Sequence, residues 1–215
     1  MSPYNVQFKK RFYQKNFGGK LFTWKELEHL INIRPLMDEK RVLVLNDEKF
    51  RWNDNDVWTI NPDCYPPTLL KELIETQVCY IKEMSRATEK INAFAAQLEK
   101  IYRLPTDAHI YSCKNPDLKH PFGIHFDESH NVIVQCEGKT NFKVWDKVRD
   151  KEQNNCDMKL NEDPLLDVEM NSGDAIWIPA YYPHLATSRT SRLSVSFPST
   201  ELNDPFLQNR QWVKL

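Results

Sequence analysis

The sequence has few of the features that mark a membrane, secreted or nucleic-acid-binding protein. No apolar run approaches the roughly 18 residues that a membrane-spanning helix needs, and residues 1–20 are rich in Lys, Arg and Tyr. We therefore expect neither a membrane span nor a secretory signal. The formal net charge is −1 and no basic tract stands out, so there is no clear nucleic-acid signature. The five cysteines are odd in number and lack a Cys-x-x-Cys spacing, which predicts reduced thiols and a cytoplasmic protein.

Glycine is also scarce, and its placement is informative. Three of the five glycines, Gly123, Gly138 and Gly173, lie in the second half of the chain, where tight turns between strands need them. Apolar and aromatic residues are plentiful: 40% of the 215 residues are hydrophobic, and there are six Trp and eleven Phe. This supply is enough for one sizeable core and predicts a single domain.

The predicted domain covers residues 1–215, with a lead-in of helices and strands at 1–105 and a barrel core at 106–198. In the lead-in, Thr23 is a suitable helix N-cap because Glu26 follows three residues later and completes a capping box. The longest helix repeats apolar residues at spacings of three and four, which is typical of a helix packed on a core. The expected helices are 24–33, 68–76 (opened by Pro67) and 86–103, and the expected strands are 41–45, 57–60, 78–81 and 107–113.

From Phe122 onward, short extended runs alternate with turns. Several short strands at this spacing are typical of a double-sheet jelly roll of the cupin kind, also called a double-stranded β-helix. The predicted fold class is therefore mainly β with flanking helices. The expected strands of this half are 124–127, 131–137, 141–146, 165–169, 175–178, 184–187 and 192–198.

One run in this half, Gly123–Glu128 (GIHFDE), carries residues suited to metal chemistry. Residues i and i+2 of a strand project from the same face, roughly 7 Å apart along the chain, so His125 and Asp127 would point into the same space. A catalytic metal needs a third ligand, and His184 is the best candidate because it follows an apolar strand and a proline turn. Two histidines and one carboxylate with open coordination positions form the facial triad of non-haem Fe(II) oxygenases. We therefore predict His125, Asp127 and His184 as catalytic metal ligands.

The order of the surrounding motifs resembles that of a known family. A strand with Tyr111 comes first, then the Gly-x-His-x-Asp, a Gln-x-x-Gly at 135–138, a Gly-Asp turn at 173–174, the proline turn before His184, and a Ser-rich strand at 191–197. This set, over residues 57 to 198, resembles the JmjC-like, cupin-type 2-oxoglutarate oxygenases, particularly the ribosomal oxygenase branch. The ordered set is far more specific than His-x-Asp alone.

The resemblance implies a cofactor set and an activity. Fe(II) held by His125, Asp127 and His184 would bind 2-oxoglutarate as a cosubstrate and use O2. The implied reaction is hydroxylation of a protein side chain, a free amino acid or a small metabolite. Tyr111 would meet the distal carboxylate of 2-oxoglutarate, and Asn131 would lie near the cosubstrate. A homodimer is a further expectation, because barrels of this kind often dimerise.

The chain departs from the family at Thr140. Members of this branch usually carry Lys or Arg two residues after the Gln-x-x-Gly glycine, aimed into the barrel at the far carboxylate. In a regular strand Thr140 points inward, whereas Lys139 and Lys143 point outward. A dicarboxylate in a dry pocket still needs a cation, because a buried unpaired charge is costly.

Arg192 is the best-placed replacement for the missing cation. Other 2-oxoglutarate oxygenases, outside this branch, use an Arg-x-Ser on the corresponding last strand, and this chain has Arg192-Leu193-Ser194 there. We expect Arg192, Ser194 and Tyr111 to clamp the carboxylate, and Thr140 to add at most a hydrogen bond.

Two other functions stay open from the sequence. A metal cupin isomerase, or a dioxygenase that does not use 2-oxoglutarate, usually has three histidines and a glutamate, and Asp127 argues against this. An inactive cupin-like binding module would explain the missing family cation, but the intact triad argues against it. Of the other histidines, we expect His29 to be solvated and His109, His120 and His130 to lie off the metal.

Overall fold

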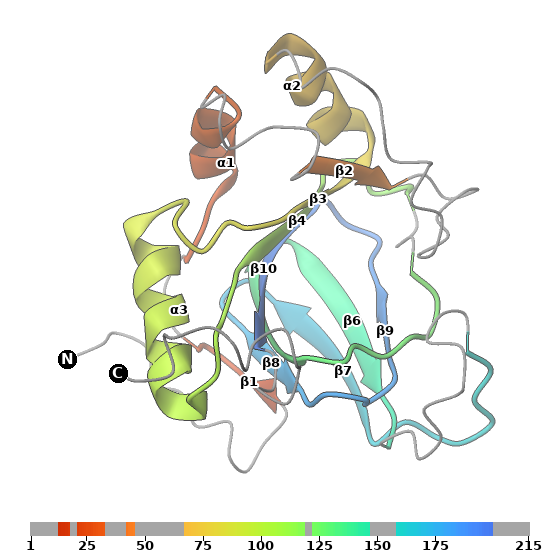
Figure 1. Ribbon diagram of the computed structural model, residues 1–215. Helices are drawn as coiled ribbons and strands as arrows, with labels where there is room; N and C mark the ends of the chain where they lie inside the picture. The colour runs from red at the N-terminus through yellow and green to blue at the C-terminus, as the bar shows by residue number, and fades with distance from the viewer. Residues whose placement is uncertain are drawn as a thin grey trace.

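Two antiparallel sheets face each other in the computed structural model of the chain (Figure 1). The structure describes residues 13–17, 21–32, 42–45, 67–118, 122–146 and 158–199. Within these residues the larger sheet has seven strands in the order β1-β8-β5-β10-β4-β3-β2, and the smaller has three in the order β7-β6-β9. The strand bounds are β1 Tyr13–Gln14, β2 Val42–Leu45, β3 Val78–Ile81, β4 His109–Cys113, β5 His130–Glu137, β6 Lys139–Val144, β7 Leu166–Asn171, β8 Ala175–Ile178, β9 His184–Thr187 and β10 Arg192–Ser199.

The strand order is that of a jelly roll. Strand β5 lies in the larger sheet, β6 and β7 in the smaller, β8 in the larger, β9 in the smaller and β10 in the larger, so the chain winds between the two sheets. Apolar side chains of both sheets pack between them, with Ile133, Ile176 and Ile178 from the larger sheet against Phe142 and Val144 from the smaller. The expected fold class, mainly β with flanking helices around a cupin-type barrel, is confirmed.

The part of the chain before the barrel that the structure describes contains three helices, which are α1 Trp24–Leu30, α2 Pro67–Thr76 and α3 Glu89–Tyr102. The predicted capping box of α1 is confirmed, since the Thr23 hydroxyl accepts a hydrogen bond from the Glu26 amide (3.2 Å) and donates one to the Glu26 carboxylate (2.8 Å). Helix α3 begins three residues later than predicted because Thr88 is its N-cap. The Thr88 backbone is extended, and its hydroxyl accepts from the Ile91 amide.

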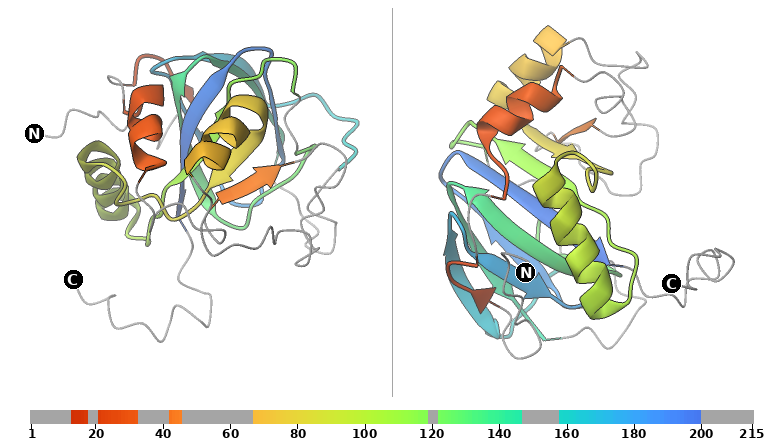
Figure 2. Two further views of the ribbon diagram at one scale, coloured as in Figure 1. Left: turned by 90° about the horizontal axis from the view of Figure 1, so that it is seen from above. Right: turned by 90° about the vertical axis from the view of Figure 1, so that its left-hand side faces the viewer.

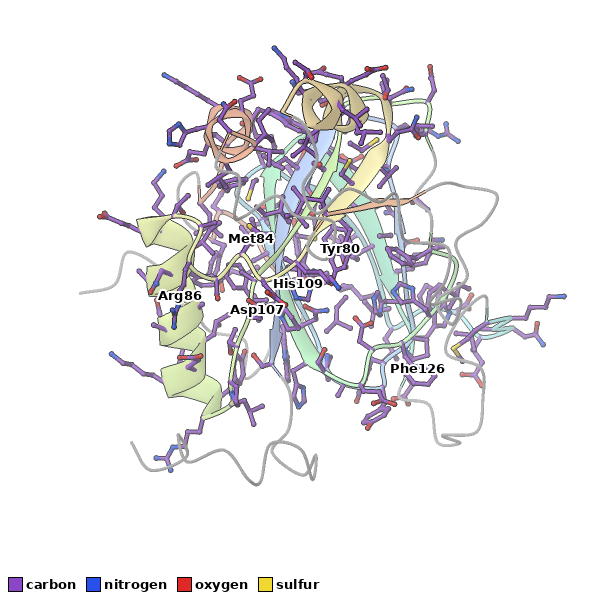
Figure 3. All side chains as sticks on the ribbon, turned by 45° about the horizontal axis from the view of Figure 1, so that its top comes forward. Tyr80, Met84, Arg86, Asp107, His109 and Phe126 are labelled. Carbon is purple, nitrogen blue, oxygen red and sulfur yellow. The ribbon has the colours of Figure 1, made fainter. Side chains whose placement is uncertain are left out.

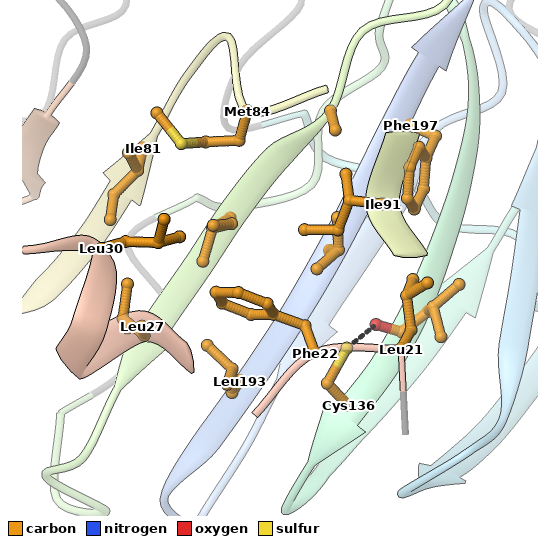
Figure 4. Close-up of a cluster of buried hydrophobic side chains, with 14 of the residues drawn as sticks. Leu21, Phe22, Leu27, Leu30, Ile81, Met84, Ile91, Cys136, Leu193 and Phe197 are labelled. Carbon is orange, nitrogen blue, oxygen red and sulfur yellow. Dashed lines mark hydrogen bonds between the residues drawn. The ribbon is translucent and has the colours of Figure 1, made fainter. Parts of the chain in front are cut away.

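The main hydrophobic core lies on the outer face of the larger sheet, under α1 and α3 (Figure 2). Figure 4 shows Ile91 of α3 beside Phe197 of β10, and Leu27 of α1 farther along the same core, near Leu30. The predicted apolar stripe of α3 is fully buried at Ile91, Phe94 and Leu98, whereas its last member, Ile101, is only partly buried. Because the helices cover this outer face, the opposite face of the sheet is left to line the barrel interior.

Two segments differ from the prediction. Residues 124–127 form no regular strand, because only His125 pairs, through an isolated antiparallel bridge to His184. Beyond His184 the backbone leaves the extended conformation. The Pro183 carbonyl faces the Trp145 amide on the opposite side (2.9 Å), and Tyr181 has φ +66°, so the ladder does not continue. Conversely, Tyr13 and Gln14, for which no strand was predicted, form the edge strand β1 beside β8. The strand predicted at 57–60 lies outside the described residues.

Two of the glycines occupy positions that require glycine. Gly138, between β5 and β6, has φ +74°, and Gly173, between β7 and β8, has φ +92°. A Cβ atom at Gly138 would lie 1.8 Å from the Ser191 carbonyl oxygen, whereas one at Gly173 would meet nothing within 4 Å. Gly138 therefore also allows a close backbone approach next to Arg192.

Three of the five cysteines lie in the part of the chain that the structure describes. Cys79, Cys113 and Cys136 are buried free thiols. Cys136 packs in the main core, as expected of a small apolar residue. Within the described residues, no helix is long and apolar enough to cross a lipid bilayer.

Candidate active site

The three predicted metal ligands lie together between the two sheets. His125 and Asp127 belong to the irregular segment between β4 and β5, and His184 is the first residue of β9. Their potential ligand atoms all lie within 4.8 Å of one another. The His184 Nε2 is 3.8 Å from the Asp127 Oδ2, and the two imidazole centroids are 4.2 Å apart. The bridge between His125 and His184 brings the two histidines together, with backbone hydrogen bonds of 3.1 and 2.7 Å.

Both imidazoles are oriented by their own backbone neighbourhood. The Nδ1 of His125 lies 2.9 Å from the Gly123 carbonyl oxygen, and the Nδ1 of His184 lies 3.1 Å from the Tyr182 carbonyl oxygen. A carbonyl oxygen can only accept, so both Nδ1 atoms carry a hydrogen. The Nε2 atoms are then left with a free lone pair, which is the arrangement that metal-binding histidines use.

Asp127 is held by a short polar chain. The Asn131 amide nitrogen of β5 donates to the Asp127 Oδ2 at 3.0 Å, and the Asn131 amide oxygen accepts from the Ser196 hydroxyl of β10. Asn131 and Ser196 are both buried, so this chain is fixed between two paired strands. The carboxylate is therefore oriented before any ligand binds.

The donor set fits a divalent transition metal. Burial, reinforced by the charge of His125, lowers the pKa of His184 to about 4, which favours the neutral imidazole that a metal requires. Metal bonds of roughly 2.0–2.2 Å place adjacent ligand atoms about 3 Å apart, so the His184–Asp127 pair needs to close by about 1 Å. Two imidazoles and one carboxylate match the facial arrangement of non-haem iron.

A pocket joins this cluster to the predicted cosubstrate residues, with about 610 Å³ of empty space including its open mouth. All eight predicted site residues line it: Tyr111, His125, Asp127, Asn131, Thr140, His184, Arg192 and Ser194. The pocket also takes in apolar residues from both sheets, among them Val78, Ile133 and Phe142. The sequence-predicted set thus converges on one concave site.

Arg192 is the notable charge in this pocket. Its side chain is only 6% exposed, and its Nη1 and Nη2 atoms have no hydrogen-bond partner among the described residues. Burial lowers the pKa of Arg192, but a guanidinium remains charged in a protein. Arg192, Ser194 and Ser196 face the pocket, while the alternating residues of β10 pack in the outer core.

The residues of β6 point as their alternation predicted. Thr140 is 5% exposed and lines the pocket. Lys139 and Lys143 lie on the outer side of the smaller sheet, where they pair with Glu169 and Asp167 at 3.0 and 3.1 Å. Neither lysine lines the pocket.

The other histidines that the structure describes are outside the metal cluster. His29 is exposed in α1, and His130 accepts a hydrogen bond from the Ala180 amide at 3.2 Å. His109 shares the inner face of β4 with Tyr111, as predicted, and contacts Asp107 and Tyr80. His120 lies outside the described residues.

The family model that describes the JmjC domain matches residues 83–204 of this sequence, which is more than half of the chain. This chain belongs to the JmjC domain family. The family expected from the motifs is therefore confirmed. Among curated proteins, this JmjC domain is similar to the bifunctional lysine-specific demethylase and histidyl-hydroxylase NO66 of Drosophila yakuba, with 18% identity over 190 residues that cover 84% of this chain and 26% of NO66.

Among solved structures, the JmjC domain is similar to YcfD, a ribosomal oxygenase from Escherichia coli. The complex of YcfD with cobalt and 2-oxoglutarate has a TM-score of 0.57 at 18% identity, covering 89% of this chain and 48% of YcfD. Another X-ray structure of YcfD has a TM-score of 0.59 at 17% identity, covering 92% and 52%. At this identity the likeness shows the fold. The chain spans about half the length of YcfD and about a quarter of NO66.

Two residues at or next to this JmjC site, Ser196 and Tyr80, were not predicted from the sequence. Ser196, which supports Asn131, could have been found, because it lies two residues beyond Ser194 on the same face of β10. Tyr80, which is hydrogen-bonded to both His109 and Tyr111, could not. Its place depends on the register between β3 and β4, which no sequence motif indicates.

Proposed function

We propose that this JmjC domain is an Fe(II)- and 2-oxoglutarate-dependent hydroxylase. The observation that carries the proposal is the unpaired, buried guanidinium of Arg192 in the same pocket as the His125–Asp127–His184 cluster. 2-Oxoglutarate carries a 2-oxo acid that can chelate a metal at one end and a carboxylate that needs a cation at the other. The pocket offers a matching group for each end.

His125, Asp127 and His184 would hold the iron through Nε2, a carboxylate oxygen and Nε2. When bound, Fe(II) would supply the centre at which 2-oxoglutarate, O2 and the substrate react to give succinate, carbon dioxide and the hydroxylated substrate. The protein's own part is orientation. The Gly123 and Tyr182 carbonyls keep both Nε2 atoms available, and Asn131 fixes the Asp127 carboxylate. No side chain needs to act as a general base.

Arg192 would bind the far carboxylate of 2-oxoglutarate. A buried charge without a partner is costly by several kcal/mol, and a carboxylate in the pocket would remove that cost through charge-assisted hydrogen bonds. Ser194 and Tyr111, which are register partners on β10 and β4, line the same wall and would donate further hydrogen bonds. Thr140, across the pocket on β6, would add at most one.

The substrate we propose is a side chain of a protein, with a free amino acid or small metabolite as the other candidate. The names of the relatives, a histidyl-hydroxylase and a ribosomal oxygenase, support the protein substrate. An inactive binding module gains no support from the site, because both the triad and a cation are present in the pocket.

Succinate formation from 2-oxoglutarate, with Fe(II) and ascorbate, tests the proposal. We expect Arg192→Ala to raise the KM for 2-oxoglutarate by about tenfold or more, which is about 1.4 kcal/mol of binding, while iron stays bound. Lys139→Ala is the matched control, since it removes a cation of the outer side and should change KM little. The opposite outcome, with Lys139 needed and Arg192 dispensable, would contradict the assignment. No succinate from wild-type protein would favour a cupin that does not use 2-oxoglutarate.

A further inference from the structure

A chain of hydrogen bonds leads from the protein surface to Tyr111 in the pocket. The Asp107 Oδ2 lies 3.2 Å from the His109 Nε2, and the His109 Nδ1 is hydrogen-bonded to the Tyr80 hydroxyl. The Tyr80 hydroxyl is in turn hydrogen-bonded to the Tyr111 hydroxyl, and the centroids of the two rings are 4.6 Å apart. Figure 3 shows Asp107, His109 and Tyr80 next to one another. We call these four residues the relay.

The relay is built into the sheet. Tyr80 of β3 and Tyr111 of β4 are register partners, and His109 lies two residues before Tyr111 on the same face. Asp107 lies two residues before the start of β4, and its side chain is 34% exposed, compared with 19% for His109. The outer end of the relay can therefore exchange protons with water, while Tyr111 at the inner end lines the pocket.

Asp107 selects the tautomer of His109. Burial acts to raise the pKa of Asp107, but hydrogen bonds from the His109 side chain and the Ala108 amide outweigh it, so the pKa lies below its usual value. The ionised carboxylate can only accept, so the His109 Nε2 carries a hydrogen. In a neutral imidazole the Nδ1 is then an acceptor, and the Tyr80 hydroxyl must donate to it.

The hydrogens available for donation set the directions of the hydrogen bonds made by the Tyr80 and Tyr111 hydroxyls. When Tyr80 donates to a neutral His109, its oxygen accepts from Tyr111, and the single hydroxyl hydrogen of Tyr111 points away from the pocket. When His109 is an imidazolium, its Nδ1–H donates to Tyr80, Tyr80 donates to Tyr111, and the Tyr111 hydrogen is released toward the pocket. Only in the second state can Tyr111 donate to a carboxylate and keep its hydrogen bond to Tyr80.

We propose that Asp107, His109 and Tyr80 are positioning residues that couple the binding of the cosubstrate carboxylate at Tyr111 to uptake of one proton by His109. This inference rests on the proposed function, because it takes the carboxylate of 2-oxoglutarate as the ligand. The ligand-bound state binds the proton more tightly than the free state, so 2-oxoglutarate affinity falls as pH rises.

Other ionisable groups around the relay do not supply this proton. Tyr80 and Tyr111 are both buried phenols whose pKa values lie above the ordinary phenol value, chiefly because of burial and further because of the Asp127 charge. Strand β10 places the uncharged Ser196 opposite His109, and Asp107 also accepts from Ser85. Among the side-chain types of the relay, only an imidazole ordinarily changes charge near neutral pH, so we assign the proton to His109.

Calorimetry on the Mn(II)-loaded protein tests the coupling without turnover. 2-Oxoglutarate is titrated from about pH 6 to about pH 8.5, the range around histidine titration, in two buffers of different ionisation enthalpy. We expect wild-type affinity to fall by about tenfold or more across this range, with proton uptake on binding. Tyr80→Phe cuts the relay but leaves Tyr111 free to donate, so its affinity should stay at the wild-type low-pH value throughout. Tyr111→Phe should stay at the wild-type high-pH value.

A merely structural role for Tyr80 predicts a different result. In that case Tyr80→Phe would bind more weakly and keep the wild-type pH profile, which would overturn the coupling. Tyr102→Phe is the matched control, because the Tyr102 hydroxyl is buried without a hydrogen-bond partner among the described residues and lies outside the pocket. It should keep the wild-type affinity and pH profile.

The nitrogen NMR spectrum of the His109 imidazole separates this inference from the proposed function. A neutral His109 that carries its hydrogen on Nε2 in the ligand-free protein supports the relay, and one that carries it on Nδ1 overturns it. If 2-oxoglutarate binding does not depend on pH but still requires Arg192, the coupling is overturned and the proposed function stands. No binding at any pH would contradict the proposed function, and the imidazole spectrum alone would then decide the relay.

Discussion

Phe94→Ala tests whether α3 is anchored to the outer face of the larger sheet. Phe94 is fully buried. Its ring centroid lies 5.2 Å from that of Phe17 and 4.7 Å from that of Phe197 of β10, and both contacts are edge to face. Loss of a core Phe costs about 3–5 kcal/mol. Each edge-to-face contact contributes about 0.5–1.5 kcal/mol beyond the buried area, so we expect the upper half of that range.

Urea titration measures the effect, with stability read from the midpoint and the slope of unfolding. Ile101→Ala is the matched control on the same helix, because Ile101 is only partly buried and should cost less than about 2 kcal/mol. Phe94 does not line the pocket, so iron binding should be unchanged where the variant is folded. A loss below about 1 kcal/mol for Phe94→Ala would refute the packing of α3 on this sheet.

Two further predictions concern the turn and the wall of the pocket. Gly138→Ala should cost more than Gly173→Ala in the same titration, because both strain a positive φ by about 1–3 kcal/mol but only the first meets the Ser191 carbonyl; equal losses would contradict the close approach. Thr140→Arg, placed in the Arg192→Ala background, should recover most of the lost affinity for 2-oxoglutarate, because both positions line the pocket. A KM no lower than that of Arg192→Ala alone would show that the two positions do not reach the same carboxylate.

The smaller sheet could be predicted because its strands alternate between more and less buried positions. On β6, burial of Thr140 and exposure of Lys139 follow from the period of two alone. The metal ligands were predicted correctly as a group, but the prediction assumed that His125 and Asp127 share one face of a regular strand, and the structure has no such strand there. His125 and Asp127 do not sit on a regular strand; the bridge to His184 and the hydrogen bond from the Tyr181 amide to the Asp127 carbonyl hold that segment.

What could not be predicted depends on pairings between distant segments. Strand β1 has only two residues and no periodicity of its own, so its place beside β8 is set by the tertiary structure. Tyr80 reaches Tyr111 only through the register of β3 with β4, and α3 separates these strands in the chain. Asp107 precedes β4, and its carboxylate matters only because His109 folds next to it.

Iron content and succinate formation, measured together on the ligand variants, test the central claim most directly. After anaerobic reconstitution with Fe(II), we expect about one iron per wild-type chain and conversion of 2-oxoglutarate to succinate. His125→Ala, Asp127→Ala and His184→Ala should each lose both the iron and the succinate while remaining folded, and His130→Ala should keep iron affinity within several-fold. Full iron occupancy in Asp127→Ala would contradict the facial triad on which the account rests.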